Sequence, residues 1–323
     1  MGILKSLNKR IRICKNFGFK AAIAGVLQSN IRFPAFLSRI LSRWHDKIVL
    51  DYLNLNFNYV IDKYKNFELD KSELKALTPA PVWVMWLQGE DNMPEIVKEC
   101  YKSIKANCAG HPVKLLTQEN LKDYVKLPEH IWKRVESKQM TLTHFSNFCR
   151  MYLLYTYGGL WLDATIFVTS EIKSEVFDLP FYTINYDFTL NHRNVNLGRW
   201  TAFLLAGKPG NIVCKAVLDL LIEYWRANDM LIDYSVFDYS IAEAYNMLPE
   251  CRKLIDSVPR NNTEWRSLAK LLNTEFNQEI FNNLKLSTQF FKLTHKQRFN
   301  KLINNRETFY AHILEMYKYN FKL

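Results

Sequence analysis

The stretch YGGLWLDATIF, residues 157–167, decides the fold class. Two glycines, Gly158 and Gly159, interrupt the chain, and a short apolar run follows them and ends in a single carboxylate, Asp163. An apolar run of this length after a Gly-Gly break is typical of a buried strand. Because strand ends are where an open α/β sheet presents groups to a ligand, Asp163 is a candidate site residue.

The residues before this strand predict a helix over 141–157. Aromatic residues recur there at helical spacing, Thr141 or Thr143 offers an N-cap, and the two glycines stop the helix. Asn147 and Arg150 are three residues apart, so they share one helix face. We therefore expect this polar face to lie toward the same cleft as the carboxylate that ends the strand.

The segments on either side predict an α/β domain. Residues 82–87 are β-branched and aromatic and predict a first strand, residues 94–107 predict a helix, and residues 112–117 predict a second strand. Further on, residues 178–188 and 198–210 predict strands with turns, and residues 212–229 and 233–248 predict helices. Two prolines within residues 74–81 mark the boundary before this domain.

The composition is that of a globular protein. Of the 323 residues 48% are hydrophobic, and only 10 are Gly and 10 are Pro, which excludes a disordered or low-complexity chain. The six cysteines are scattered without a CxxC pair, so neither a zinc site nor a disulfide framework is indicated, and a reducing compartment fits best.

The net charge of +11 is concentrated at the N-terminus. Residues 1–50 hold ten Lys or Arg and one acid, a net of +9, which leaves +2 for the rest. Bases alternate there with Ile, Leu and Phe as in amphipathic helices that lie on an anionic membrane. No uncharged apolar run reaches the 18 or so residues of a spanning helix, so we expect a peripheral anchor. The alternatives are a basic helix packed on the main domain, a secretory signal, and RNA binding, for which no RNA-module signature is present.

Several segments resemble the bacterial capsular-polysaccharide-synthesis glycosyltransferases, relatives of the large group with a DxD sugar-transfer motif. The likeness spans about residues 78–300, and the segments that carry it are THFSNFCRMYLLYTYGGLWLDAT, VWVMWLQGEDNMPEIVKEC, WTAFLLAGKPGN and EYWRANDMLIDYSVFDY. It implies an α/β GT-A fold, a nucleotide-binding sandwich with a mixed, mostly parallel sheet. The division that follows is a basic helical N-terminal extension, residues 1–75, and a glycosyltransferase domain, residues 78–323.

The resemblance also implies a divalent metal, Mn²⁺ or Mg²⁺, which neutralises the charge that builds on a diphosphate leaving group. The DxD motif departs from the family here, since the triplet is Asp163-Ala164-Thr165 and only the first acid remains. We expect Asp163 to bind the metal with Thr165 as a weak neutral helper. Either His295 or His312 can complete the shell, because related folds bring a C-terminal histidine to the metal; otherwise each is a structural or surface residue.

The resemblance further implies donor-binding residues on the predicted helix and after the first strand. Arg150 is expected to clamp phosphate or sugar oxygens, and its alternative is a buried salt bridge, with Asp163 as one available partner. Asn147 and His144 lie in the same motif, and Asn147 is expected to bind donor sugar hydroxyls or else to be a plain helix-face amide. Gln88 is placed for the base or ribose, or is a plain turn residue.

The reacting centre and the acceptor side are expected near residues 233–239. On a regular helix Asp233 and Asp238 point about 140° apart, so we do not expect them to act as one pair. Either can hold an acceptor hydroxyl or stabilise the reacting carbon, and Asp233 can instead cap a helix. Trp200 and Thr201 resemble the acceptor-side loop of the family, with a core tryptophan as the alternative.

These expectations describe a glycosyltransferase that moves a sugar from a nucleotide sugar to a saccharide acceptor that is often lipid-linked. A UDP-sugar is the donor that we expect first. Retention of configuration is what the nearest DxD relatives imply. The expected place is the cytoplasmic face of a bacterial membrane, with no nucleic-acid partner. Two other classes stay open: a non-catalytic member that binds a sugar nucleotide or scaffolds an assembly complex, and a protein that binds RNA or a membrane surface through its N-terminus.

Overall fold

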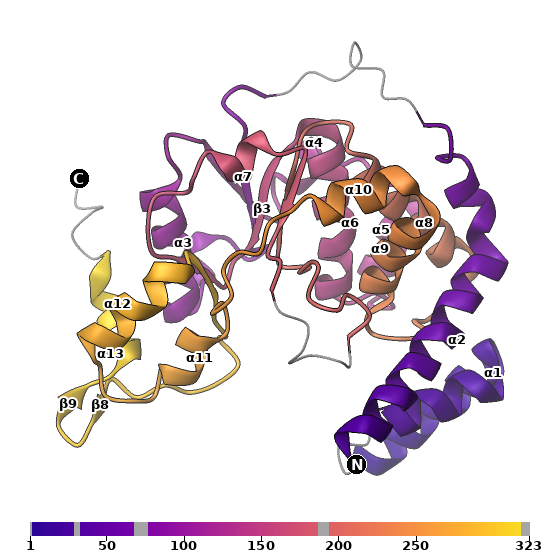
Figure 1. Ribbon diagram of the computed structural model, residues 1–323, viewed down its shortest axis with the longest axis horizontal. Coiled ribbons are helices and arrows are strands. Elements are labelled where there is room, and N and C mark those ends of the chain that lie inside the picture. The colour runs from indigo at the N-terminus through magenta and orange to yellow at the C-terminus, as the bar shows by residue number, and fades with distance from the viewer. Residues whose placement is uncertain (1, 29–32, 68–76, 187–193, 318–323) are drawn as a thin grey trace.

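A five-stranded sheet forms the centre of the computed structural model, which describes residues 2–28, 33–67, 77–186 and 194–317 (Figure 1). The strand order is β2-β1-β3-β6-β5. The strands are β1 (Val82–Met85), β2 (Val113–Leu116), β3 (Gly159–Asp163), β5 (Phe181–Thr183) and β6 (Leu204–Gly207).

Four of these strands run in one direction. β1 pairs in parallel with both β2 and β3, whereas β6 is antiparallel to both of its neighbours, β3 and β5. This arrangement confirms the predicted mixed, mostly parallel sheet. In the register of β1 and β3, Met85 pairs with Asp163, so both strands end at the same edge. The residues that follow β1 therefore lie beside the carboxylate that ends β3.

Helices cover the sheet as the sequence pattern predicts. α3 (Glu95–Asn107) joins β1 to β2. α6 (Leu142–Tyr157) packs on β3 and β6, α8 (Ile212–Ala227) packs on α6, and α9 (Val236–Met247) packs on α8. Figure 1 shows α3 on one side of β3 and α6 on the other. The Thr141 side chain caps α6 by accepting a hydrogen bond from the backbone N–H of His144.

The Gly-Gly break is required by the close approach of two chain segments. Gly158 and Gly159 have φ of 68° and 95°, a region that residues with a Cβ rarely adopt. A Cβ on Gly159 would lie 2.1 Å from the carbonyl oxygen of Pro81. The two glycines therefore allow the chain to leave α6 and enter the sheet directly beside β1.

A C-terminal segment packs against the end of the sheet. It contains α11 (Ser267–Leu271), α12 (Gln278–Ser287), α13 (Phe309–Met316), β7 (Phe290–Lys292), β8 (Leu302–Ile303) and β9 (Arg306–Glu307). β7 pairs antiparallel with β4 (Ile166–Val168), which follows Asp163 closely, and this pairing sets Lys292 opposite Ile166. The shorter elements are η1 (Glu90–Asn92), α4 (Leu121–Tyr124), α5 (Glu129–Glu136), α7 (Glu175–Asp178) and α10 (Pro249–Asp256).

Two long helices form the N-terminal part, as predicted. α1 (Gly2–Gln28) is kinked at Gly18 and packs on α2 (Ala35–Asp62), which in turn packs on α8 and α9. Leu53 and Phe57 of α2 are 0% and 2% exposed within the main core. The predicted division between residues 1–75 and 78–323 stays a prediction, but α2 shares one core with the sheet domain. No helix in the described ranges is both long enough and apolar enough to cross a bilayer.

Replacing Phe57 tests whether α2 is part of the cooperative fold. Its ring lies 5.9 Å from that of Tyr224 in α8, so Phe57→Ala opens a cavity between the helices. We expect the free energy of unfolding to fall by about 3–5 kcal/mol in a denaturant titration. Leu55→Ala is the control on the same helix, because Leu55 is 82% exposed, and it should change stability by less than about 0.5 kcal/mol. An unchanged main transition for Phe57→Ala would show that α2 unfolds separately.

Candidate functional site

A cavity of about 500 Å³ opens at the shared carboxyl edge of β1 and β3; we call it the Asp163 cavity. Its walls come from the residues after β1, the first turn of α6, the end of β3 and the residues after β7. The lining residues are Met85, Trp86, Leu87, Gln88, Leu142, Thr143, Ser146, Trp161, Asp163, Ala164, Thr165, Lys292, Leu293, Thr294, His295 and Lys296. A cavity of this size at strand ends is typical of a small-molecule site.

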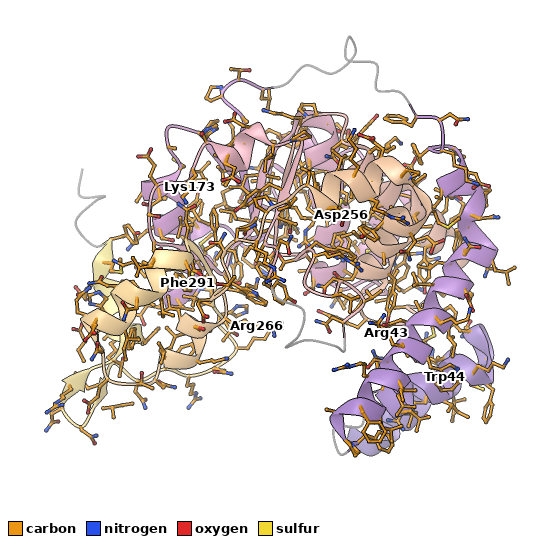
Figure 2. The ribbon with its side chains drawn as sticks, in the orientation of Figure 1. Arg43, Trp44, Lys173, Asp256, Arg266 and Phe291 are labelled. Atoms are coloured by element: carbon orange, nitrogen blue, oxygen red, sulfur yellow. The ribbon has the colours of Figure 1, made fainter. Side chains whose placement is uncertain are left out.

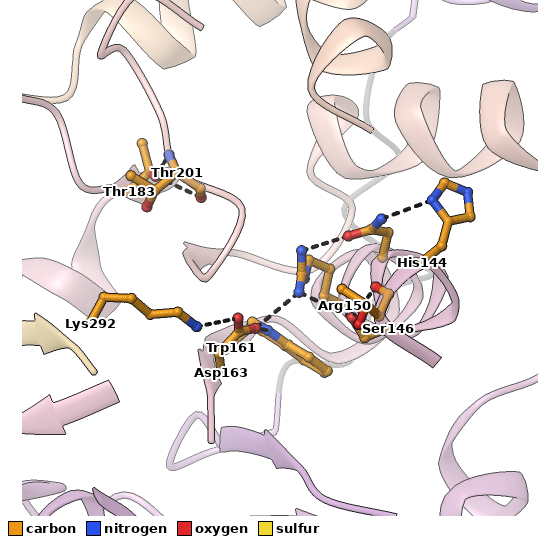
Figure 3. A network of polar contacts seen from close by, with 10 residues as sticks. His144, Ser146, Arg150, Trp161, Asp163, Thr183, Thr201 and Lys292 are labelled. Carbon is orange, nitrogen blue, oxygen red and sulfur yellow. Dashed lines mark hydrogen bonds and ion pairs between the residues drawn. The ribbon is translucent and has the colours of Figure 1, made fainter. Parts of the chain in front are cut away.

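Asp163 lies between two cations (Figure 3). Its Oδ1 accepts hydrogen bonds of 3.0 Å from Arg150 Nη2 and from Trp161 Nε1, and its Oδ2 accepts one of 2.7 Å from Lys292 Nζ. Burial alone would raise the pKa of Asp163, but the charges of Lys292 and Arg150 and these hydrogen bonds outweigh it and lower the pKa. Asp163 is therefore a carboxylate at neutral pH, with both oxygens already bonded.

Arg150 lies behind the cavity wall. Its side chain is 4% exposed; Nη1 donates to Asn147 Oδ1 at 2.7 Å, and Nη2 donates to Ser146 as well as to Asp163. The guanidinium also lies 5.1 Å from the centre of the Trp161 ring. Arg150 is not among the lining residues of the cavity. Of the two roles left open by the sequence, the structure shows the buried salt bridge to Asp163; the donor clamp stays a prediction.

His144 and Asn147 support this arginine from the core. Trp225 Nε1 donates to His144 Nε2 at 2.7 Å, and the amide of Asn147 lies 3.4 Å from His144 Nδ1. Burial, and then the charge of Arg150, lower the pKa of His144 to about 4, so the imidazole is neutral. Both residues are buried and neither lines the Asp163 cavity. The structure places them as supports of Arg150, not in reach of a ligand there.

The structure separates the two predicted histidines. Gln88, Thr165 and His295 line the Asp163 cavity, and the His295 ring lies 5.5 Å from that of Trp86. His312 instead stacks on Phe276 at 3.7 Å within the C-terminal helices and is not among the lining residues. Of these two histidines, His295 therefore shares a cavity with Asp163 and His312 does not.

The side chains around Asp163 do not form a shell for Mn²⁺ or Mg²⁺. At a nucleotide such an ion is commonly held by one or two protein carboxylates with a free oxygen, and phosphate oxygens and waters complete its shell. The cavity holds one carboxylate, and both of its oxygens are engaged by Arg150, Lys292 and Trp161. The other charged lining residue is Lys296, and no group of three His, Cys, Asp or Glu suited to a metal occurs in the described part of the chain. The metal stays a prediction that this donor set does not favour.

A second, smaller cavity of about 310 Å³ lies at the start of α9; we call it the Asp238 cavity. Its lining residues are Gln28, Asn194, Val195, Asp233, Tyr234, Ser235, Asp238 and Tyr239. The helical spacing assumed for Asp233 and Asp238 does not apply across this segment, and both residues line this one cavity; that they do not act as a pair stays a prediction. α9 begins only at Val236, and Asp233 precedes it, accepting a hydrogen bond of 2.7 Å from the backbone N–H of Ser235.

Asp238 is held in place from the core. Trp200 Nε1 donates to Asp238 Oδ1 at 3.0 Å. Burial raises the pKa of Asp238 to about 6, against the opposing effects of this hydrogen bond and the charge of Arg150. Trp200 itself is fully buried, and Thr201 is 3% exposed and bonded through its backbone to Thr183. Neither Trp200 nor Thr201 lines either cavity, and Trp200 reaches the Asp238 cavity only through its hydrogen bond to Asp238.

The sequence interpretation missed two groups of residues. In the Asp163 cavity they are Lys292 and Lys296, which flank His295 in the stretch KLTHK. The one indication in the sequence was that these bases lie close to a predicted metal-binding histidine. The others are His45 and Asp46 of α2. They do not line the Asp238 cavity, but their side chains bond the hydroxyl of its lining residue Tyr239 at 3.1 and 2.7 Å. Burial raises the pKa of Asp46 to about 6.

The chain matches one protein family along most of its length. No curated protein sequence matches it. A sequence model described as "Capsular polysaccharide synthesis protein" matches residues 30–313, which include α2, the sheet, the Asp163 cavity and every lining residue of the Asp238 cavity except Gln28. The chain therefore belongs to the capsular polysaccharide synthesis protein family.

Proposed function

We propose that the protein is a glycosyltransferase of capsular polysaccharide synthesis, which moves a sugar from a nucleotide sugar to a saccharide acceptor. The observation that carries this proposal is the position of Asp163, at the shared carboxyl edge of β1 and β3 in a cavity with basic walls. In open α/β sheets this edge is where nucleotides bind. A UDP-sugar is the first donor to test, and the acceptor class is a saccharide, free or lipid-linked.

The walls of the Asp163 cavity suit the parts of a nucleotide sugar. Gln88 offers hydrogen bonds to a base or ribose, and the half-buried indole of Trp86 offers a stacking face. Lys292 and Lys296 supply positive charge where a diphosphate needs it. Arg150 and Asn147 keep Asp163 in place from behind.

The Asp238 cavity is our candidate for the acceptor side. Carboxylates are good acceptors for sugar hydroxyls, and Asp233 and Asp238 both line this cavity. In the transfer, the bond between the anomeric carbon and the diphosphate oxygen breaks, and the acceptor oxygen forms the new bond and loses its proton. Asp238 is our candidate to take up that proton, because a pKa of about 6 makes its carboxylate a usable base near neutral pH. Retention of configuration is proposed from the family resemblance alone.

The competing proposal is a non-catalytic member that binds a sugar nucleotide within an assembly complex. The observation in its favour is that both oxygens of Asp163 are already bonded to protein groups. Binding of a nucleotide sugar without release of nucleotide, across donors and acceptors, would favour it over the glycosyltransferase.

Asp163→Asn tests the proposed donor site. The amide keeps the volume of the side chain but removes the charge that fixes Lys292 and Arg150, so release of UDP from the active UDP-sugar should fall about 100-fold or more. The matched control is Asp229→Asn, since Asp229 also pairs with an arginine, Arg134, but is 78% exposed on the surface. The control should keep its rate within about threefold. If Asp163→Asn releases UDP as fast as Asp229→Asn does, Asp163 has no role in the transfer.

Asp238→Asn tests the acceptor-side carboxyl through pH. The folded protein holds a proton on Asp238 up to about pH 6, whereas the unfolded carboxyl loses it near pH 3.8, so wild-type stability falls as pH rises through this window and stays lower above it. The amide still accepts from Trp200 but does not ionise. We expect the variant to be more stable than wild type by about 1–3 kcal/mol at a pH of about 8, and about equal at a pH of about 4.

The measurement is denaturant unfolding at both pH values, together with sugar transfer, which should be lost. Asp229→Asn is again the control and should show no gain that depends on pH. A gain of the same size at both pH values would contradict a raised pKa for Asp238.

We also propose that the protein binds the cytoplasmic face of a bacterial membrane through the outer face of α2. Phe36, Ile40 and Trp44 follow one another at helical spacing and are 67%, 58% and 38% exposed. Arg43 and Lys47 lie on the same side of the helix and are exposed (Figure 2 labels Arg43 and Trp44). Aromatic side chains beside bases are suited to the surface of an anionic bilayer.

Vesicle co-sedimentation tests this surface. The protein should bind vesicles of phosphatidylcholine with phosphatidylglycerol and should bind pure phosphatidylcholine vesicles much less. The double substitution Arg43→Gln with Trp44→Ser should weaken binding to the anionic vesicles about tenfold or more, since each surface base contributes about 1 kcal/mol. Leu55→Ser is the control, because Leu55 is an exposed apolar residue of the same helix. Equal binding to both kinds of vesicle would contradict the proposal.

A further inference from the structure

Positive charge dominates the Asp163 cavity. Its lining includes one acid, Asp163, and two lysines, Lys292 and Lys296. Burial and then the charges of the two lysines lower the pKa of His295, so its imidazole adds no charge near neutral pH. Arg150, behind the wall, already balances the charge of Asp163 at 3.0 Å. The two lysine charges are therefore in excess, and they face a space where the proposed function requires an anion.

Lys292 is fixed by the backbone as well as by its ion pair. The pairing of β7 with β4 sets it opposite Ile166, and the next residue, Leu293, donates its backbone N–H to the carbonyl oxygen of Thr165 at 2.9 Å. Its ammonium lies 2.7 Å from Asp163 Oδ2 and 5.2 Å from the centre of the Phe203 ring. An ammonium has three donors, so Lys292 retains donors for a ligand while it is bonded to Asp163.

Lys296 adds a second cation on the same short segment. It is exposed, it lines the cavity, and in the described part of the chain it forms no ion pair with a carboxylate. An incoming anion can therefore bind Lys296 without first breaking an ion pair. Lys292 thus supplies a fixed charge and Lys296 an adaptable one.

We propose that Lys292 and Lys296 bind the diphosphate of the donor directly, in the place where the family resemblance implies a divalent metal, and that Asp163 is a positioning residue that holds the Lys292 ammonium. This inference rests on the proposed glycosyltransferase function. When the bond between the anomeric carbon and the diphosphate oxygen breaks, the electron pair stays on the diphosphate, and the two ammonium groups neutralise the added charge. The acceptor oxygen forms the new bond to the anomeric carbon, and its proton passes to a base on the acceptor side.

Titration calorimetry with chelator present tests this inference. The ligands are UDP, GDP and inorganic pyrophosphate, with uridine as the ligand that lacks phosphate. We expect at least one nucleoside diphosphate to bind in EDTA, with a Kd that changes less than about threefold when Mn²⁺ replaces the EDTA. Lys292→Met should weaken this binding about 10–100-fold, the size of a lost charged hydrogen bond, and leave any uridine binding unchanged.

Three further variants complete the test. Lys292→Arg keeps the charge and should recover part of the affinity. Lys296→Met removes an exposed cation without touching the buried ion pairs, so it should weaken diphosphate binding even if Lys292→Met unfolds the protein. Lys301→Met is the matched control, since Lys301 pairs with Glu95 outside the cavity, and it should bind like wild type.

The outcomes separate the inference from the proposed function. Nucleotide binding that requires Mn²⁺ and disappears in EDTA would overturn the lysine site but support the donor cavity. Undiminished UDP binding in EDTA by both Lys292→Met and Lys296→Met would also overturn the lysine site. Failure of every nucleotide and nucleotide sugar to bind under either condition would overturn the proposed function itself.

Discussion

The buried ion pair between Arg150 and Asp163 is the interaction on which the site depends. It joins α6 to the end of β3, its neighbour in the sequence, and Lys292 extends it to β7. One carboxylate thus ties the α6–β3 unit to a strand residue 129 positions away. Because the Arg150 side chain is 4% exposed, its charge is stable only while Asp163 and Asn147 accept its hydrogen bonds. The Gly-Gly break is a condition for this arrangement, since it lets β3 lie close against Pro81 and so fixes where Asp163 emerges.

The sheet and its covering helices could be predicted because each depends on a pattern within a short window. The strand that ends at Asp163, the helix before it and the βαβ unit upstream all carry a local periodicity and a clear stop signal. Lys292 could not be predicted in the same way. It lies 129 residues from Asp163, and only the pairing of β4 with β7 brings the two together. Nothing in the sequence near Asp163 specifies that partner.

The partial errors have similar physical causes. Local sequence does not distinguish His295 from His312, because the difference depends on how the C-terminal segment returns to the sheet, where His312 is stacked against Phe276. Helical geometry does not relate Asp233 to Asp238, because Asp233 lies before the start of α9, where the chain turns. The position of Arg150 on the polar face of α6 could be predicted from helical spacing. How deeply its side chain is buried could not, because that depends on the packing of α9, whose Phe237 ring lies 5.2 Å from the guanidinium.

The two faces of α2 connect the proposed membrane surface to the Asp238 cavity. On its inner face, Asp46 accepts a hydrogen bond from Tyr239, a residue that lines that cavity, while on its outer face Phe36 and Trp44 are exposed. A helix with its side chains is about 10–12 Å across, so a bilayer on the outer face would lie roughly that far from the groups on the inner face. A saccharide that extends from a lipid could therefore reach Asp238 while its lipid stays in the membrane. The same helix would then both anchor the protein and place its acceptor cavity beside the surface that carries the acceptor.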